Sequence, residues 1–189
     1  LILSPIRSTY PENYKGTIIF LGNKDYQYIK KKNPKAIIEK ISTVWSDKEK
    51  LFLDNRYLSN LENIFFKKIG SLIDKKNGTN NDNKYWSIFL RPTVFAILTT
   101  LYERWLKIQH VIKNYEIENC KFLNSKIEDF ISIDSDDFYK KIYFEDYFNQ
   151  IIFQDILENH NFKFQKFEFN IKTAKDNEKY KPKLFFYIK

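Results

Sequence analysis

The sequence predicts an open α/β fold in which a Rossmann-like sheet is combined with long amphipathic helices. Two short β-rich runs lie near the start of the chain, and a loop follows each of them. Two long segments further on carry hydrophobic residues at helical spacing. Hydrophobic residues make up 43% of the 189 positions, which is enough to build a sizeable core. We therefore expect one α/β domain over residues 1–171, followed at 172–189 by a linker and the start of a further strand.

The expected sheet begins with two strands. Residues 1–5 are a short apolar run that ends at proline, and residues 17–21 are β-rich and end at the turn-forming pair Gly22-Asn23. In open α/β sheets, ligands lie beyond the carboxyl ends of the strands. The loops 6–14 and 22–28 are therefore expected to form the walls of a binding site.

The first long helix is predicted to begin at a capping box. In the run Ser46-Asp47-Lys48-Glu49, the serine hydroxyl can accept from the amide three residues on, and Glu49 can reach back. A single apolar stripe then runs to about Lys75, and it is formed by Leu51, Leu58, Leu61, Phe65, Ile69 and Leu72. Residues 74–84, which contain Gly78 and several asparagines, are expected to form a loop.

The second long helix is predicted to begin near Pro92, since proline suits the first turn of a helix. Its apolar stripe consists of Val94, Ile97, Leu98, Leu101, Trp105, Ile108 and Ile112. Arg104 falls just beside this stripe, whereas Glu103 falls on the opposite side, which we expect to face solvent. Glu103 and Lys107 are four residues apart and should form a favourable ion pair.

The last third of the chain predicts a third helix over about 136–159 and then a strand with a bulge over 162–171. The triplet Asp134-Ser135-Asp136 stands where this helix should begin. Two carboxylates at this spacing could chelate a hard divalent cation, but acidic residues at a helix start more often accept hydrogen bonds from free amides. We therefore expect helix capping here and no metal site.

Composition limits the classes of function. The net charge of +8 favours partners that carry negative charge, such as nucleic acid, anionic lipid or phosphorylated substrates, although AT-rich codons would by themselves enrich lysine. Two histidines and one cysteine exclude a His/Cys metal site, and four glycines leave no phosphate-cradling loop, so we expect no cofactor. No apolar run is long enough to cross a bilayer and no secretory signal is visible, which predicts a cytoplasmic protein.

A basic cluster, Lys30-Lys31-Lys32, lies beside Tyr26 and Tyr28. Basic and aromatic side chains together can bind single-stranded nucleic acid. No motif of a known nucleic-acid-binding fold accompanies the cluster, so a solvated lysine surface is the favoured interpretation. Nucleic acid is therefore not expected as a partner.

Arg91 and Arg104 are the candidate binding residues. In a chain so rich in lysine, an arginine points to a need for the forked guanidinium, which binds carboxylate or phosphate through two hydrogen bonds. A structural ion pair explains the same two residues equally well. Trp86 and Trp105 are expected in the core, Trp105 because it lies on the apolar stripe of its helix.

Six segments stand in a recognisable order, namely Leu1-Ile2-Leu3-Ser4, Ile18-Ile19-Phe20-Leu21-Gly22, Trp45-Ser46-Asp47-Lys48, residues 54–61, Tyr85-Trp86-Ser87-Ile88 and Tyr102-Glu103-Arg104-Trp105. Together they resemble the amino-terminal region of a bacterial transferase family that is encoded in surface-polysaccharide loci. The resemblance covers residues 1–114. Members are longer than this chain, which also lacks methionine and has apolar runs at both ends, so we expect it to be part of a longer protein.

The resemblance implies a two-lobed, GT-B-like glycosyltransferase in which this chain is the acceptor-side lobe. A nucleotide-sugar donor would bind to a carboxyl-terminal half outside this chain. The substrate-binding residues would be Arg91, Arg104, Tyr85 and Trp86. Glu12 and Asp25, in the loops beyond the first strands, are the candidates for the base that activates the acceptor hydroxyl.

The acceptor would be a glycan or a lipid-linked saccharide. The basic surface would suit peripheral contact with an anionic membrane. Two other interpretations stay open, namely a non-catalytic basic module for nucleic acid or a partner protein, and a purely structural domain.

Overall fold

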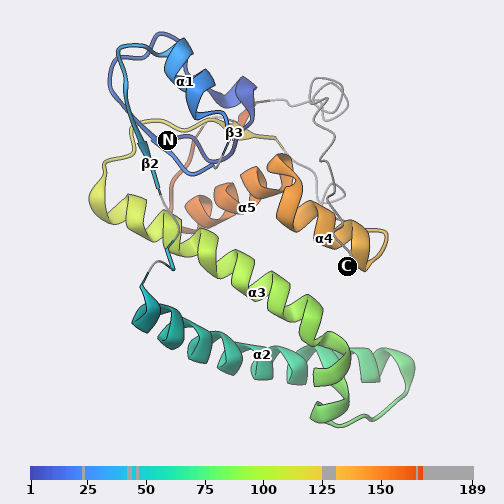
Figure 1. Cartoon of the computed structure of the whole chain (residues 1–189). Helices are drawn as coiled ribbons and strands as arrows, with labels where there is room; N and C mark the ends of the chain where they lie inside the picture. The colour runs from blue at the N-terminus through green and yellow to red at the C-terminus, as the bar shows by residue number, and fades with distance from the viewer. Residues whose placement is uncertain (23, 42–43, 46, 125–130, 165, 168–189) are drawn as a thin grey trace, which may run out of the picture.

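The structure is a computed structural model, and it describes residues 1–22, 24–41, 44–45, 47–124, 131–164 and 166–167. Its elements in chain order are a short 3-10 helix at Arg7–Thr9, β1 at Thr17–Phe20, α1 at Tyr26–Lys32, β2 at Ile37–Lys40, α2 at Lys48–Asn77, α3 at Asn83–Asn114, β3 at Phe122–Leu123, α4 at Ser135–Phe144, α5 at Asp146–Asn159 and β4 at Lys166–Phe167. Strands and α1 lie at one end of the molecule, and α2 lies at the other (Figure 1).

The first sheet is parallel, as expected, but it is small. β1 pairs with β2 in the register Thr17↔Ile37 to Phe20↔Lys40. The predicted strand at 1–5 is reduced to a single parallel bridge between Ile2 and Phe20, in which the Ile2 amide donates to the Ile19 carbonyl over 2.8 Å. Neither α1 nor β2 was predicted; β2 is the strand that pairs with β1, and α1 lies in the crossover between them. The α/β class therefore holds, with a smaller sheet and more helix than the sequence indicated.

The main core lies between this sheet and the carboxyl-terminal halves of α3 and α5. It is formed by Leu3, Ile19, Leu21, Ile41, Ile108, Val111, Cys120, Phe122, Phe153 and Leu157. Burial raises the pKa of the Cys120 thiol to about 12, so this cysteine is a small buried side chain and not a reactive thiolate. The core fixes the ends of β1 and α3 relative to α5, which positions the pocket described below.

Helix α2 begins one residue later than the predicted capping box. Its N-cap is Asp47, whose carboxylate accepts from the amides of Glu49 and Lys50, while Ser46 lies outside the described residues. The predicted stripe is also rotated, because Leu51, Phe65 and Leu72 are exposed. The buried positions recur every four residues, at Asp54, Leu58, Glu62, Phe66, Gly70 and Asp74. Three of these six are carboxylates, which a stripe of apolar residues alone could not predict.

Helix α3 begins nine residues earlier than predicted, at Asn83, where the Asp82 carboxylate caps the helix by accepting from the Tyr85 amide. Pro92 therefore lies inside the helix and not at its start. Proline cannot donate a backbone hydrogen bond there, and the first turns of α3 bend away from the axis of the rest (Figure 1). The expectation that Trp105 is in the core is wrong, because its side chain is 41% exposed.

Asp74 joins the ends of the α2–α3 hairpin. Its carboxylate accepts from the Thr79 hydroxyl, from the backbone and side-chain amides of Asn81, and from the Trp86 indole over 2.9 Å. Gly70 makes room for this indole, since a Cβ at position 70 would lie 2.3 Å from it. Gly78 ends α2 in the left-handed conformation with φ of 68°, as its place in the predicted turn suggests. Trp86 therefore serves to close the hairpin.

The Asp74 interactions predict a dependence of stability on pH. Burial alone would raise the pKa of Asp74, but the hydrogen bonds from Thr79, Trp86 and Asn81 outweigh it and lower the pKa from 3.8 to about 2. A carboxylate with a depressed pKa stabilises the fold at every pH above its unfolded value, and the contribution disappears as the pH falls from about 3.8 to about 2. We expect Asp74→Asn to be less stable than the wild type at pH 7, and the two to converge near pH 2 in urea denaturation.

The control for this prediction is Asp134→Asn, at a helix N-cap where asparagine serves as well as aspartate. It should change stability little across the same pH range. A constant gap between Asp74→Asn and the wild type from pH 7 down to pH 2 would contradict the assignment of a carboxylate interaction at Asp74.

The third predicted helix is two helices, because the backbone of Glu145 is extended between α4 and α5. The capping interpretation of the acidic triplet is confirmed, since the Asp134 carboxylate accepts from the Asp137 amide over 2.8 Å. Among the described residues, no group of three or more His, Cys, Asp or Glu side chains could hold a metal ion. Of the predicted strand at 162–171, the described residues 162–164 and 166–167 contain β4, which pairs with β3 in parallel. Residues 168–189, including the predicted linker, lie outside the described residues.

Candidate functional site

A pocket of about 420 Å³ lies beyond the carboxyl ends of β1 and of the segment that precedes it. Ser4 and Pro5 line it from that first segment, and Leu21, Gly22 and Lys24 line it from the end of β1. Helices α3, α4 and α5 complete its wall. Of the two loops that were expected to form a site, 22–28 contributes to the pocket, whereas no residue of 6–14 lines it.

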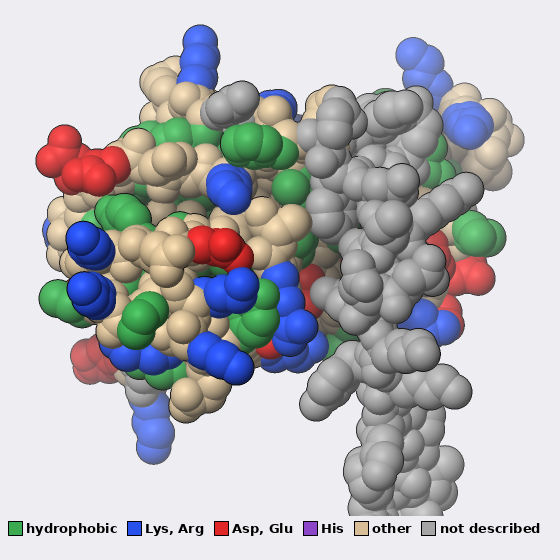
Figure 2. All heavy atoms as spheres, turned by 90° about the horizontal axis from the view of Figure 1, so that it is seen from above, with side chains coloured by type: hydrophobic (Ala, Val, Ile, Leu, Met, Phe, Trp, Pro, Cys, Tyr) green, Lys and Arg blue, Asp and Glu red, His purple; other side chains and the backbone are tan. Residues whose placement is uncertain are grey.

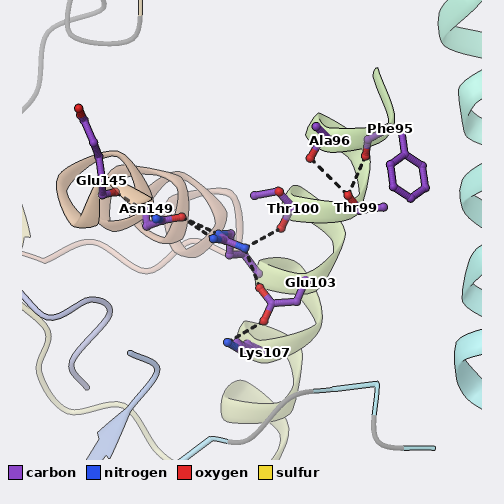
Figure 3. A network of polar contacts seen from close by, with 9 residues as sticks. Phe95, Ala96, Thr99, Thr100, Glu103, Lys107, Glu145 and Asn149 are labelled. Carbon is purple, nitrogen blue, oxygen red and sulfur yellow. Dashed lines mark hydrogen bonds and ion pairs between the residues drawn. The ribbon is translucent and has the colours of Figure 1, made fainter. Parts of the chain in front are cut away.

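Three charged side chains of α3 meet in this pocket, and we call Glu103, Arg104 and Lys107 the ionic cluster (Figure 3). The two oxygens of Glu103 accept from different cations, Oε2 from Nη1 of Arg104 over 2.7 Å and Oε1 from Nζ of Lys107 over 2.6 Å. The side chains are largely buried, with 16% of Glu103, 16% of Arg104 and 8% of Lys107 exposed. Two cations facing one carboxylate leave the ionic cluster with a net charge of +1.

The Arg104 guanidinium is held mainly by the protein itself. Its Nε and Nη2 both donate to the side-chain oxygen of Asn149, and Nη1 also donates to the Thr100 carbonyl over 3.4 Å (Figure 3). Asn149 is fixed in turn by a hydrogen bond to the carbonyl of Glu145. Burial lowers the pKa of Arg104 and the Glu103 carboxylate raises it, and arginine stays charged at neutral pH in either case. Counted over the residues that the structure describes, four of the five N–H groups of Arg104 have an acceptor, so one is left for a ligand and the free fork that the sequence suggested is not offered.

Lys107 is the cation with unused hydrogen-bonding capacity. A lysine ammonium has three N–H groups, and among the described residues Glu103 accepts from Nζ of Lys107. Two N–H groups therefore remain for a ligand in the pocket that Lys107 lines. The ionic cluster carries one positive charge in excess, and a largely buried cation attracts anions strongly because its surroundings screen the charge poorly. The arrangement can bind phosphate or carboxylate.

The other predicted binding residues lie along the hairpin, away from this pocket. Arg91 is exposed, and its Nη1 lies 4.0 Å from Glu62, with the guanidinium over the Phe66 ring. Trp86 precedes Arg104 by 18 residues of α3, which is roughly 27 Å along a helix. Tyr85 packs its ring against Trp86. Of the four predicted binding residues, the structure thus brings Arg104 alone into the pocket among the residues it describes.

The two predicted bases are also outside the residues that line the pocket. Glu12 accepts from Nζ of Lys32 over 2.9 Å, and this hydrogen bond lowers the pKa of Glu12. Asp25 accepts from Nε of Arg7 over 3.0 Å and follows Lys24, which does line the pocket. Their role as bases stays a prediction.

Two members of the ionic cluster, Glu103 and Lys107, are not recognisable as site residues from the sequence pattern. The ion pair between Glu103 and Lys107 was predicted and is confirmed, but Glu103 was assigned to the solvent side. The assignment is wrong because α3 packs on two sides. Val94 and Leu98 of the predicted stripe pack against α2, and Glu103 lines the pocket together with residues of α4 and α5. Asn149 could not be identified from the sequence as the partner of Arg104, since an isolated asparagine in a helix has no characteristic spacing to other residues.

A family model described as LIC12162 family transferase matches residues 1–187. The chain belongs to this transferase family. Neither the curated proteins nor the solved structures contain a match.

Membership of the LIC12162 transferase family confirms the coarse part of the resemblance, namely a transferase family, and the match extends beyond residues 1–114, to which the resemblance was limited. The match also covers the ionic cluster and every residue that lines the pocket. In the part of the chain that the structure describes, no helix is both long and apolar enough to cross a membrane.

Proposed function

We propose that this LIC12162 family transferase moves a sugar from an activated donor to a glycan or lipid-linked acceptor in the synthesis of bacterial surface polysaccharide. In this proposal the chain is the acceptor-side, Rossmann-like lobe of a GT-B-like protein, and a further domain binds the nucleotide-sugar donor. The parallel pairing of β1 with β2 and the position of the pocket at the strand ends support it. We further propose that the protein acts in the cytoplasm, next to the membrane.

The observation that carries the proposal is the net positive ionic cluster. Sugar transfer from a nucleotide donor releases a nucleoside monophosphate or diphosphate, and lipid-linked acceptors carry phosphate as well. Fixed cations beside such a group stabilise the negative charge that develops during transfer. Lys107 has two N–H groups and Arg104 one for this purpose, and their positions are set before a ligand arrives by Glu103 and Asn149.

A base for the acceptor hydroxyl is the second requirement of such a reaction. We retain Glu12 and Asp25 as proposed bases, and Asp25 is the nearer of the two in sequence to a residue of the pocket wall. Asp146 of α5 lines the pocket itself and is a third carboxylate that could take this role. Separate Asn substitutions of Asp25 and Asp146 would distinguish them in any assay of transfer.

Thermal shift of the chain with phosphate-bearing ligands tests the pocket. The panel is inorganic phosphate and UDP, which stand for the phosphate group released in transfer, and a short-chain prenyl diphosphate, which stands for the phosphate of a lipid-linked acceptor. A ligand at about a hundred times its dissociation constant stabilises the folded state by about 2.7 kcal/mol, which is about 5–10 °C in melting temperature for a chain of this size. We expect at least one ligand to give such a rise, and Lys107→Met to abolish it.

The matched control is Lys113→Met, which removes an exposed lysine from the same helix outside the pocket. It should leave the rise intact. If no ligand raises the melting temperature of the folded chain, or if both variants reduce the rise equally, the ionic cluster is not a substrate site and the proposal fails.

A further inference from the structure

The α2–α3 hairpin exposes an unusual amount of hydrophobic surface. Of the large hydrophobic side chains that are exposed in the described part of the chain, 13 of 21 lie on α2 or α3. The most exposed near the closed end are Leu72 at 67%, Ile88 at 68% and Phe89 at 64%. The hairpin is well formed inside, where Leu58, Phe66, Val94 and Leu98 pack together. The exposed side chains are therefore additional to those that the hairpin needs for its own stability.

Charge on the hairpin is divided between an acidic inside and a basic outside. We call residues 62–97 the hairpin tip. Two of its three carboxylates, Glu62 and Asp74, are buried between the helices. Its six cations are all exposed, and they are Lys67, Lys68, Lys75, Lys76, Lys84 and Arg91. Asp82, which caps α3, is the exposed carboxylate. The outer surface of the hairpin tip thus combines aliphatic and aromatic side chains with an excess of positive charge.

The exposed hydrophobic side chains and the exposed cations of the hairpin tip lie at similar positions along the length of the hairpin. The indole of Trp86 contacts Asp74 and Gly70, and Arg91 contacts Glu62 and Phe66. This antiparallel pairing places Leu72 and Lys68 of α2 alongside the turns of α3 that carry Ile88 and Phe89. α2 is about 45 Å long at 1.5 Å per residue, and it lies farthest from the strands (Figure 1).

We propose that the hairpin tip docks on the surface of an anionic lipid bilayer. Lysines and arginines near the surface are attracted by anionic headgroups, and exposed apolar side chains enter the boundary with the acyl chains. A second copy of the chain fits this surface less well, because two hairpin tips would bring like charges together. Nucleic acid would leave Leu72 and Ile88 without a role, since aliphatic side chains do not stack on bases as aromatic rings do.

The docking surface deepens the proposed function but does not depend on the pocket. It rests on the proposed function only in that a lipid-linked acceptor would be presented at the same membrane. The pocket is lined by α3 residues from Thr99 onwards, beyond the hairpin tip. A substitution in the hairpin tip can therefore remove membrane binding without changing ligand binding in the pocket. A substitution in the pocket can likewise remove ligand binding without changing membrane binding.

The test is co-sedimentation of the chain with vesicles of phosphatidylglycerol and phosphatidylcholine, compared with phosphatidylcholine alone. The charge variant is K67Q/K68Q/K75Q/K76Q. Its matched control, K15Q/K31Q/K35Q/K40Q, removes the same charge from exposed lysines elsewhere. Figure 2 looks onto the end of the molecule opposite the hairpin, where Lys and Arg side chains are also spread over the surface. The apolar variant is L72Q/I88Q/F89Q, checked for folding by circular dichroism.

We expect binding to the anionic vesicles, a loss of roughly tenfold or more in partitioning for the charge variant, and a similar loss for the apolar variant. The control should lose far less. Three results would each overturn the proposal: no binding by the wild type, equal losses for the charge variant and its control, or a dimer in sedimentation equilibrium that L72Q/I88Q/F89Q dissociates. Thermal shift with the pocket ligand in the same variants keeps a failure here separate from a failure of the proposed transferase site.

Discussion

Replacing Glu103 by glutamine is expected to lower the free energy of unfolding by about 3–5 kcal/mol, because the change removes the shared partner of two buried cations. The Glu103 carboxylate accepts from both Arg104 and Lys107, and all three side chains are largely buried. A neutral amide cannot balance their charge, so two like charges would remain close together in surroundings of low polarity. Urea denaturation at pH 7 measures the loss directly.

The control for this prediction is Glu116→Gln, which replaces an exposed glutamate shortly after the end of α3. It should stay within about 0.5 kcal/mol of the wild type, as surface changes usually do. A further variant, Glu103→Gln combined with Lys107→Met, should recover part of the loss, because it removes one of the two uncompensated charges. If Glu103→Gln is as stable as its control, the ionic cluster does not hold α3 against α5.

Local signals in the sequence were sufficient to predict where several elements begin and end. Asp134 caps α4 through a side-chain hydrogen bond to the amide three residues on, and Gly78 ends α2 in a conformation that glycine adopts without strain. Both features depend on residues that are close in sequence. The capping site of α2 was misplaced by one residue, since Ser46 and Asp47 are both good N-cap residues.

Features that depend on distant partners could not be predicted in this way. The packed face of α2 contains Asp54, which accepts from Tyr102 of α3 over 2.9 Å as well as from Trp45 and Lys50. Burial alone would raise the pKa of Asp54, and these three hydrogen bonds outweigh it and lower the pKa. An acidic residue in an amphipathic helix is ordinarily assigned to solvent, so its burial becomes visible only once Tyr102 is placed across the hairpin.

The sequence indicated where the candidate site lies more accurately than it indicated which residues form the site. The rule that ligands lie beyond the carboxyl ends of parallel strands led to the loop 22–28, and Arg104 was selected from its rarity. Lys107 was not selected, because thirty-two lysines and arginines offered no reason to prefer it. What distinguishes Lys107 is burial, which depends on the residues of α4 and α5 that line the pocket with it and are distant in sequence.

Replacing Gln154 by leucine is the second change expected to have a large effect, with a loss of about 2–5 kcal/mol in the free energy of unfolding. Gln154 of α5 is buried and pairs with both backbone groups of Leu123, since Oε1 accepts from the Leu123 amide over 2.7 Å and Nε2 donates to the Leu123 carbonyl over 3.0 Å. The side chain of Gln154 thus pairs with the backbone of β3 in the way that a neighbouring strand would. Leucine is similar in size, so the loss would come from unsatisfied polar groups and not from a cavity.

The same substitution also removes an acceptor from Gln150, whose side-chain amide donates to Gln154 and whose carbonyl oxygen accepts from the Ser4 hydroxyl at the pocket wall. We therefore expect Gln154→Leu to raise hydrogen-exchange rates at Leu123 in addition to lowering stability in urea. Gln27→Leu, at an exposed position of α1, is the matched control and should change stability by about 0.5 kcal/mol or less. Equal stabilities of the two variants would mean that water replaces Gln154 at Leu123, and that β3 holds its place through Phe122 and the packing of the main core alone.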